Sequence, residues 1–481
     1  MAPDDVVREI SDFCRDAGLA ESTFGRLAVN DGKLVARLRD GGSVTLNTLA
    51  RLRTFMSGYA ERAPQGLSTK AMSTKAALLK PVEKISAPAP VAPAPAKVVA
   101  APAKAGDEEP KEFRFFDNRQ KYLMFVNTCS EKWVVANRIA MEINNVSPRP
   151  PAMRVFDAGV GDGTVLTRVM RAMHHKHPTM PFYIVGKEVS LEDVRLTLEK
   201  IPDRFYEHPS TVLVLTNLYY SEAPWLTPKS PSAAQGMIWK EVALSGNSSY
   251  EFEEQLTELQ SFLSENWTAK VSPKSGNPMY ERPVVLTLYR DDHRFLLDPI
   301  VPKPGRVTAD YDLIIASQPY RASSSAEFKA SKVIGPLARA IGPGGRLIGI
   351  HSTGGDPAQE IVQKVWPGEN PFKVDRHALL KAVKAHLGSF GRNLTFNAYS
   401  DVRSTFRYDM HTLPAEVSGA IGTSTLFAAW NAAIYVSQIE DRRLSEVVKN
   451  DFYLEATQQV LQARGGLWFN DESYVISRKP L

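Results

Sequence analysis

The chain has 481 residues, more than one ordinary domain uses, so its length favours two or three folded units. Hydrophobic residues make up 43% of it, and the formal net charge of +5 permits an anionic partner without requiring one. Its two cysteines, Cys14 and Cys129, form neither a disulfide framework nor a zinc-binding spacing. Because the sequence has no signal-peptide pattern and no run of about 18 apolar residues, we expect a cytoplasmic protein.

Composition divides the chain into three parts. Residues 1–62 are mixed and periodic, residues 63–110 are rich in Ala, Pro and Lys, and residues 111–481 have a globular composition. The middle part has too little apolar surface to fold, so we expect a disordered, semi-stiff linker. It is also basic before residue 107, through Lys70, Lys75, Lys80, Lys84, Lys97 and Lys104. This segment is either a plain tether or a polycationic arm for nucleic acid.

Residues 1–62 read as a small all-α domain of four short helices. Apolar spacing and glycine breaks place these helices at about 6–17, 21–29, 33–38 and 45–56. The segments Gly18–Val29 and Lys33–Leu38 resemble a phage-repressor-like helix-turn-helix, whose second helix enters the DNA major groove. Six basic residues suit a phosphate-contacting face: Arg26, Lys33, Arg37, Arg39, Arg51 and Arg53. A bundle that binds another protein remains the equal alternative, since the domain has no net charge.

A glycine-rich turn follows a short apolar strand in the third part. The strand begins at Met153 and ends at Asp157, and Gly159, Gly161 and Gly163 then alternate before a helix that starts at Thr164. Glycines let the backbone approach a ligand closely and adopt positive φ. Dinucleotide-binding enzymes use a related turn, and a plain turn is the structural alternative.

The GxGxG spacing behind Asp157 resembles the first motif of class I S-adenosylmethionine-dependent methyltransferases. The resemblance implies that Asp157, Ala158 and the three glycines hold the methionine half of S-adenosyl-L-methionine. It also implies that Glu188, which ends the apolar run from Phe182, binds the ribose hydroxyls. Asn217 follows the third strand, where the family often has an acid that contacts adenine. The alternative for Glu188 is a solvated acid at a strand end.

Residues of about 221–310 interrupt the alternation of strands and helices. We expect an insertion here between the third and fourth strands, with a helix over 250–267. We also expect a hairpin that pairs residues 284–289 with residues 295–297. Insertions of this kind commonly form lids or substrate walls.

The fourth strand, 311–317, leads into Ser317-Gln-Pro-Tyr320. This loop resembles the Asp/Asn/Ser-Pro-Pro-Tyr/Phe motif of methyltransferases that act on amino groups, with Gln318 in place of the first proline. The resemblance implies that Ser317, Pro319 and Tyr320 are catalytic: a side-chain oxygen and a backbone carbonyl accept hydrogen bonds from the target nitrogen, and the ring stacks on the substrate. An ordinary loop is the alternative.

Later segments complete the expected sheet. Gly342-Pro-Gly-Gly345 resembles a turn of the same family before a fifth strand that ends at His351, which is either a base or a hydrogen-bonded structural residue. Strands six and seven are expected at 394–399 and 473–477. The aromatic residues within 113–122 either close over the cofactor or join the core.

These observations predict an α/β fold: a Rossmann-like seven-stranded methyltransferase sheet with an insertion, plus the small helical domain. The predicted function is S-adenosylmethionine-dependent methyl transfer to a nitrogen of an unidentified substrate. The alternative is a DNA-binding regulator whose methyltransferase fold senses the cofactor without catalysis. The spacing disfavours a nucleotide-dependent oxidoreductase, and we expect no metal site, the histidines at 174–177 included.

Overall fold

A computed structural model describes residues 3–17, 19–29, 34–39, 48–49, 52–53, 55–56, 119–273, 276–411 and 421–480. The chain divides into two compact units, Met1–Ala103 and Lys104–Leu481. The linker expected at 63–110 lies outside the described residues. Within the described ranges, no helix has both the length and the apolar character that a membrane span needs.

The first unit is helical where it is described. Its helices are α1 (Pro3–Asp16), α2 (Glu21–Val29) and α3 (Leu34–Arg39). Of the fourth expected helix, residues 48–49, 52–53 and 55–56 are helical. Apolar positions at helical spacing form one small core: Val6, Ile10, Cys14, Phe24, Ala28, Leu34, Val35, Leu38 and Leu52.

Two of the six basic residues expected on a DNA-contacting face are paired with acids of the same unit. Arg39 Nη2 lies 2.5 Å from Glu21 Oε1, and Arg53 Nη2 lies 2.9 Å from Glu9 Oε2. The side chains of Arg26, Lys33 and Arg51 lie outside the described ones. DNA binding by this unit therefore stays a prediction.

The second unit is built on a large mixed sheet. Among the described residues it has ten strands, in the order β10-β12-β9-β8-β1-β2-β3-β7-β4, with β11 paired to β12. The strands are β1 (Met153–Asp157), β2 (Phe182–Lys187), β3 (Thr211–Thr216), β4 (Ile238–Leu244), β7 (Val284–Arg290), β8 (Tyr311–Ser317), β9 (Ile341–Ser352), β10 (Leu394–Asn397), β11 (Thr405–Asp409) and β12 (Trp468–Arg478). The sheet is larger than the seven strands expected, because β7 and β4 continue it beyond β3 and β11 adds to β12.

The strand order reverses at β1. After β1 the chain moves to β2 and β3 on one side, and then returns to β8 and β9 on the other. These five strands are parallel, so their carboxyl ends share one edge of the sheet. Such a switch point leaves a crevice at the carboxyl edge, where open α/β sheets bind ligands. The residues that follow β1 and β8 are therefore the first candidates for a ligand-binding site.

Helices cover both faces of the sheet. One face packs on α6 (Glu131–Ile143), α7 (Thr164–Lys176), α8 (Leu191–Lys200), α9 (Pro202–Glu207), α11 (Ser249–Thr257) and α12 (Gln260–Asn266). The other face packs on α13 (Arg294–Leu297), α15 (Gly335–Arg339), which continues α14 (Ala326–Lys329) and a π-helical turn, and α17 (Arg376–Leu387). Strand residues alternate between the two cores, as the pleat requires.

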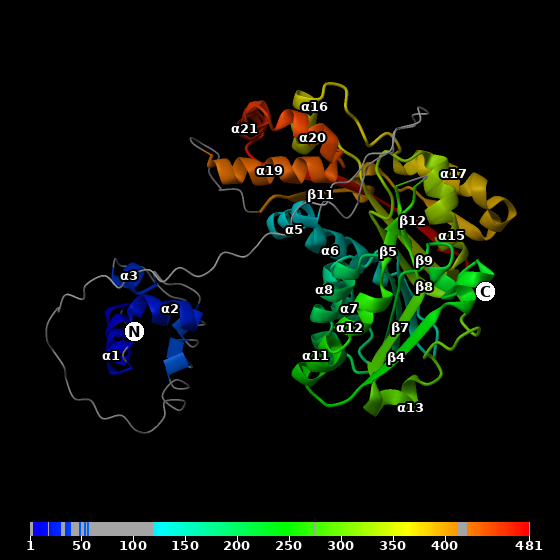
Figure 1. Cartoon of the computed structure of the whole chain (residues 1–481), viewed down its shortest axis with the longest axis horizontal. Helices are drawn as coiled ribbons and strands as arrows, with labels where there is room; N and C mark the ends of the chain where they lie inside the picture. The colour runs from blue at the N-terminus through cyan, green and yellow to red at the C-terminus, as the bar shows by residue number, and fades with distance from the viewer. Residues whose placement is uncertain are drawn as a thin grey trace, which may run out of the picture. The chain divides into compact units, whose positions relative to one another are not determined.

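A third group of helices packs beside β11 and the start of β12. It comprises α5 (Arg119–Thr128), α16 (Pro357–Val365), α19 (Thr423–Val436), α20 (Asp441–Val447) and α21 (Phe452–Arg464). Figure 1 shows these helices gathered at one end of the sheet. Their shared core includes Phe125, Trp430 and Phe469. Since β12 runs antiparallel to β9, its first residues lie at the carboxyl edge, so this group borders the crevice.

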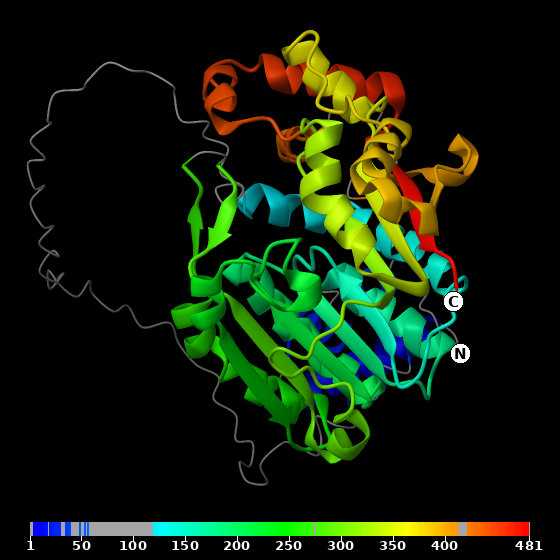
Figure 2. The same ribbon diagram turned by 90° about the vertical axis from the view of Figure 1, so that its right-hand side faces the viewer.

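The insertion lies between β3 and β8, where the sequence predicted it, and it extends the sheet. β7 pairs antiparallel with β3, and β4 pairs parallel with β7. The expected hairpin is wrong, because residues 294–297 form α13 and β7 takes β3 and β4 as its partners. The expected helix over 250–267 is two helices, α11 and α12. A separate ribbon, β5 (Ala269–Val271) with β6 (Pro278–Tyr280), projects from the large sheet (Figure 2).

Candidate functional site

The glycine turn joins β1 to α7 as predicted. Its three glycines differ in backbone conformation and in how closely other residues pack against them. Gly161 and Gly163 have φ of 55° and 78°, which favours glycine. A Cβ on Gly163 would lie 2.9 Å from Thr197 Oγ1 and 3.0 Å from Thr197 Cα, so this glycine also permits close packing on α8. A Cβ on Gly159 would meet no atom within 4 Å. Gly159 therefore opens onto unfilled space at the carboxyl edge.

Two carboxylates lie in this turn. Asp157 is 2% exposed, and its Oδ1 accepts a hydrogen bond of 3.1 Å from the Gly159 amide. Burial, reinforced by nearby Glu188, raises the pKa of Asp157 to about 6. Asp162 stands at the start of α7, where its carboxylate accepts from the Thr164 hydroxyl at 2.6 Å and from Lys200 Nζ at 2.5 Å. Ala158 is buried in the core on the other face of the sheet.

Glu188 links the end of β2 to the glycine turn. Its Oε2 accepts a 2.9 Å hydrogen bond from the Gly161 amide, and its Oε1 accepts from the amides of Val189 and Ser190 at 2.7 and 2.9 Å. The side chain is 8% exposed, so the alternative of a solvated strand-end acid does not apply. These three bonds fix the carboxylate beside the turn.

Asn217 lies after β3, and both ends of its amide contact the insertion. Nδ2 donates to the Arg282 carbonyl and Oδ1 accepts from the Val284 amide, each at 2.8 Å. One N–H and one lone pair of the amide are left for other contacts. Its proposed contact with adenine stays a prediction, since the visible role of Asn217 is to join β3 to β7.

Tyr122 of α5 covers the turn. Its hydroxyl is buried without a hydrogen-bond partner among the described residues, and it would lie 3.5 Å from a Cβ on Gly161. Lys132 Nζ lies 5.5 Å from the Tyr122 ring centroid, and Tyr435 of α19 packs on the same ring. Of the aromatic residues expected to close over the cofactor or join the core, Tyr122 reaches the turn; residues 113–118 lie outside the described ones.

The loop after β8 holds the residues predicted to be catalytic. Ser317 ends β8 and is half-buried, Gln318 has φ of 47°, and the Tyr220 hydroxyl donates to the Pro319 carbonyl at 2.8 Å. The Gln318 amide donates to Ser352 Oγ at 3.1 Å and to Asp471 Oδ2 at 3.2 Å, and accepts from the Ser352 amide. These contacts fix the loop against β9 and β12.

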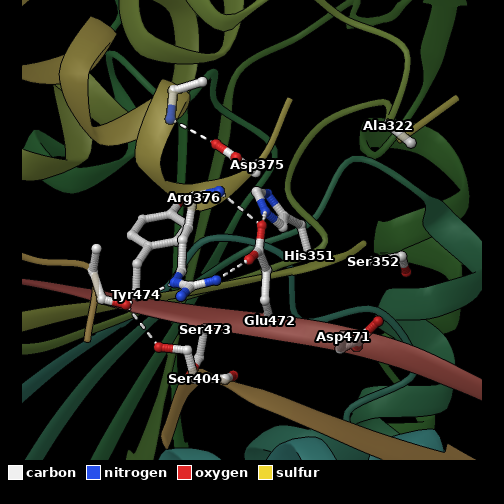
Figure 3. A network of polar contacts seen from close by, with 12 residues as sticks. Ala322, His351, Ser352, Asp375, Arg376, Ser404, Asp471, Glu472, Ser473 and Tyr474 are labelled. Carbon is white, nitrogen blue, oxygen red and sulfur yellow. Dashed lines mark hydrogen bonds and ion pairs between the residues drawn. The ribbon is translucent and has the colours of Figure 1, made fainter. Parts of the chain in front are cut away.

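Tyr320 belongs to a buried polar network rather than to an open aromatic face. Its hydroxyl lies 2.7 Å from His351 Nδ1, and His351 Nε2 lies 2.7 Å from Glu472 Oε1. Arg376 Nη1 donates to Glu472 Oε2 at 2.7 Å, as Figure 3 shows. Burial raises the pKa of Glu472, but His351 and Arg376 outweigh burial and hold it below its usual value. Both ring nitrogens of His351 have hydrogen-bonding partners, and its two interpretations, as a base or as a structural residue, stay predictions, as does the stacking role of Tyr320.

Sequence reasoning missed Tyr220 and Asp471. Asp471 follows Asn470 in the strand Trp468–Arg478, and the strand was expected to begin only at Ser473. The adjacent acids Asp471 and Glu472, directly before the apolar part of the strand, were the available signal. Tyr220 lies in a loop, and no pattern in its surroundings indicates its contact with Pro319.

Comparisons with known proteins find likenesses at the level of structure alone. No protein-family model matches the chain, and no curated protein matches it. One solved structure that it resembles is a putative sarcosine dimethylglycine methyltransferase from Galdieria sulphuraria, with 12% identity over 73% of this chain and 85% of that chain and a TM-score of 0.26. Another is the [4+2]-cyclase SpnF, with 12% identity over 78% and 86% and a TM-score of 0.25.

A third is PKMT2 from Rickettsia typhi, solved also in complex with AdoHcy. The match without AdoHcy has 12% identity over 71% of this chain and 52% of that chain, with a TM-score of 0.23. Because the TM-scores are this low, we draw the functional conclusion from the geometry of the chain itself.

Proposed function

We propose that the second unit is a methyltransferase that uses S-adenosyl-L-methionine and methylates a nitrogen. The observation that carries the proposal is the pair of carboxylates, Asp157 and Asp162, in a glycine turn at the switch point of the sheet. Dinucleotide enzymes place a diphosphate at this helix N-terminus. Here the Asp162 carboxylate, paired with Lys200, occupies the helix N-terminus, so a diphosphate would meet a negative charge there, and Asp157 is the carboxylate left for a cationic group.

The residues fit the methionine half of this cofactor, which carries an ammonium and a sulfonium. Asp157 would accept the ammonium, in the space that Gly159 leaves open. Glu188 would receive the ribose hydroxyls, and the orphan hydroxyl of Tyr122 gives a further polar contact. When bound, the cofactor supplies an electrophilic methyl group. The protein contributes orientation and exclusion of water.

The nitrogen acceptor is proposed from the loop after β8. Ser317 offers a hydroxyl oxygen at the strand next to β1, so it lies one strand away from Asp157. The Pro319 carbonyl already accepts from Tyr220, which leaves Ser317 as the oxygen of the predicted trio best placed to receive an N–H.

Calorimetric titration of the full chain tests the proposal. We expect wild-type protein to bind S-adenosyl-L-methionine and not NAD⁺. Asp157→Asn should weaken the affinity by about 10- to 100-fold, because it removes one charge-assisted hydrogen bond. Asp203→Asn is the matched control, since Asp203 is an exposed acid of α9, and it should leave the affinity unchanged. Equal affinities of wild type and Asp157→Asn, or preferential binding of NAD⁺, would exclude the proposed site.

A further inference from the structure

Polar side chains continue along the carboxyl edge beyond β1, on one face of the sheet. Val155, Leu313, Ile315, Ile348 and Ile350 all belong to the core on the α6–α7 face. Because strand residues alternate, Asp157, Ser317 and Ser352, which come next at a spacing of two on their strands, lie on that same face. A ligand held at Asp157 therefore meets β8 and β9 next along the edge.

Asp471 of β12 completes this row. It pairs with Ser352 in the ladder, and Figure 3 shows the two residues on their neighbouring strands. Its neighbours at a spacing of two fix its face: the Phe469 ring packs on Phe125 of α5, and Ser473 Oγ accepts from Arg138 of α6 at 3.0 Å. Asp471 therefore faces α5 and α6, as the glycine turn faces Tyr122. Three strand spacings separate it from β1, roughly 14 Å.

The Asp471 carboxyl is buried and incompletely satisfied. The residue is 0% exposed, Oδ2 accepts from the Gln318 amide at 3.2 Å, and Oδ1 has no partner in the part of the chain that the structure describes. Buried polar groups in proteins are nearly always hydrogen-bonded, so an orphan carboxyl oxygen indicates a missing partner. The Tyr122 hydroxyl, which lies over the glycine turn on the same face, is another buried group without a partner among the described residues.

Gln318 holds the carboxyl against the loop after β8. The left-handed backbone of Gln318 costs free energy, and its side chain is bound on both sides by Ser352 and by Asp471. A backbone held in such a conformation marks a place where the surroundings determine the geometry. The result is a fixed carboxyl on β12, beside the end of β9.

We propose that Asp471 binds the nitrogen of the methyl acceptor and takes up its proton, so that the substrate is a primary or secondary amine presented as an ammonium ion. The inference rests on the proposed function and names the substrate class of that site. The orphan Oδ1 supplies the hydrogen-bond acceptor that an N–H donor needs, and the charge of the carboxylate complements that of an ammonium.

The reaction balances with these groups alone. The ammonium proton moves to the Asp471 carboxylate, and the neutral amine keeps its lone pair. That lone pair forms the new N–C bond to the methyl group while the C–S bond of the S-adenosyl-L-methionine breaks and its electron pair stays on sulfur. The product is a methylated ammonium, and the proton on Asp471 leaves to solvent after release.

The surroundings of Asp471 suit a proton acceptor. Burial, with nearby Glu131 at the start of α6 and Asp356 before α16, raises its pKa to about 8, against the opposing effect of the neighbouring Ser352 and Gln318 side chains. Tyr408 of β11 faces it as well. A carboxyl of this kind binds a proton at pH 7 and ionises when a cation is placed beside it.

Titration of the full chain, saturated with S-adenosylhomocysteine, with butylamine and with the neutral isostere 1-butanol tests the inference. At pH 7 we expect butylammonium to bind with release of about one proton per ligand, measured as the difference between calorimetric titrations in phosphate and in Tris. At pH 9 Asp471 is already ionised before the ligand binds, so the proton that Asp471 releases at pH 7 should no longer be detected. 1-Butanol should bind at least about tenfold more weakly.

Asp471→Asn provides the matched variant, because it keeps the shape and removes the charge. It should retain the affinity for S-adenosylhomocysteine within about twofold and lose at least about tenfold in affinity for butylammonium. Proton release in wild type is measured without any variant, so a folding defect of Asp471→Asn does not decide the result. Binding of S-adenosylhomocysteine with no binding of butylamine, or with equal binding by wild type and Asp471→Asn, overturns the inference alone. No binding of S-adenosylhomocysteine overturns the proposed function.

Discussion

The two halves of the carboxyl edge are built differently. In the β1–β2 half, Glu188 contacts the glycine turn across 27 residues of sequence, and the polar groups bind backbone amides of adjacent turns. In the β8–β12 half, Gln318 contacts Asp471 across 153 residues, and Tyr320 reaches Glu472 through His351. The first half is a local arrangement, which we propose to be the cofactor site; the second is a long-range polar assembly whose parts come from four separate segments.

The difference has a physical consequence. The long-range assembly includes a buried Arg376–Glu472 pair, so it supports the fold as well as containing the residues proposed to receive the acceptor. In the local turn, Gly159 meets no atom within 4 Å and can change without disturbing the core, whereas Gly163 packs against Thr197. Variants of the two halves should therefore separate loss of stability from loss of binding.

The largest expected effect is on stability, from the second half. Glu472→Ala removes the buried partner of Arg376 and His351 and leaves the guanidinium with Asp401 as its remaining carboxylate, which should lower the free energy of unfolding by about 3 kcal/mol. Urea unfolding followed by circular dichroism measures it. The matched control is Glu360→Ala, which breaks the exposed pair with Arg464 and should cost less than about 1 kcal/mol. Similar losses in both variants would show that the buried network does not support the fold.

The pH dependence of this contribution has a definite sign. The folded pKa of Glu472 lies below its usual value, so its stabilising effect is present above the unfolded pKa and is lost as the pH falls through the folded pKa. The stability difference between wild type and Glu472→Ala should therefore shrink on acidification.

Sequence predicted the first half of the edge well, because strand, glycine turn and helix are coded by neighbouring residues. Asp157, the glycines and Glu188 lie together as expected. For the second half, the sequence predicted where strands end but not the contacts between their side chains. The partners of Tyr320, Gln318 and Asp471 depend on the pairing of β12 between β9 and β10. Tertiary contacts determine this pairing, and the local hydrophobic pattern of the sequence does not predict it. The hairpin failed for the same reason, since the partners of β7 lie elsewhere in the chain.

A smaller effect separates two glycines within the first half. Gly163→Ala places a Cβ against Thr197 at positive φ and should lower the free energy of unfolding by about 2–4 kcal/mol. Gly159→Ala meets no atom within 4 Å, so stability should change by less than about 1 kcal/mol while affinity for S-adenosyl-L-methionine falls. Thermal unfolding paired with calorimetry distinguishes them. Full cofactor affinity in Gly159→Ala would mean that the open space beside this glycine is not the binding site.

The most direct test of the central claim is the affinity for S-adenosyl-L-methionine between pH 5 and pH 7, in wild type and in Asp157→Asn. Burial raises the pKa of Asp157 to about 6, and the cofactor ammonium needs its ionised form. The ionised fraction of a group with this pKa falls about tenfold between pH 7 and pH 5, so the affinity of wild type should be lower at pH 5 than at pH 7 by about tenfold. Asp157→Asn should bind weakly with no such dependence. A pH-independent wild-type affinity, or the same pH dependence in both proteins, would contradict the assignment of this turn as the cofactor site.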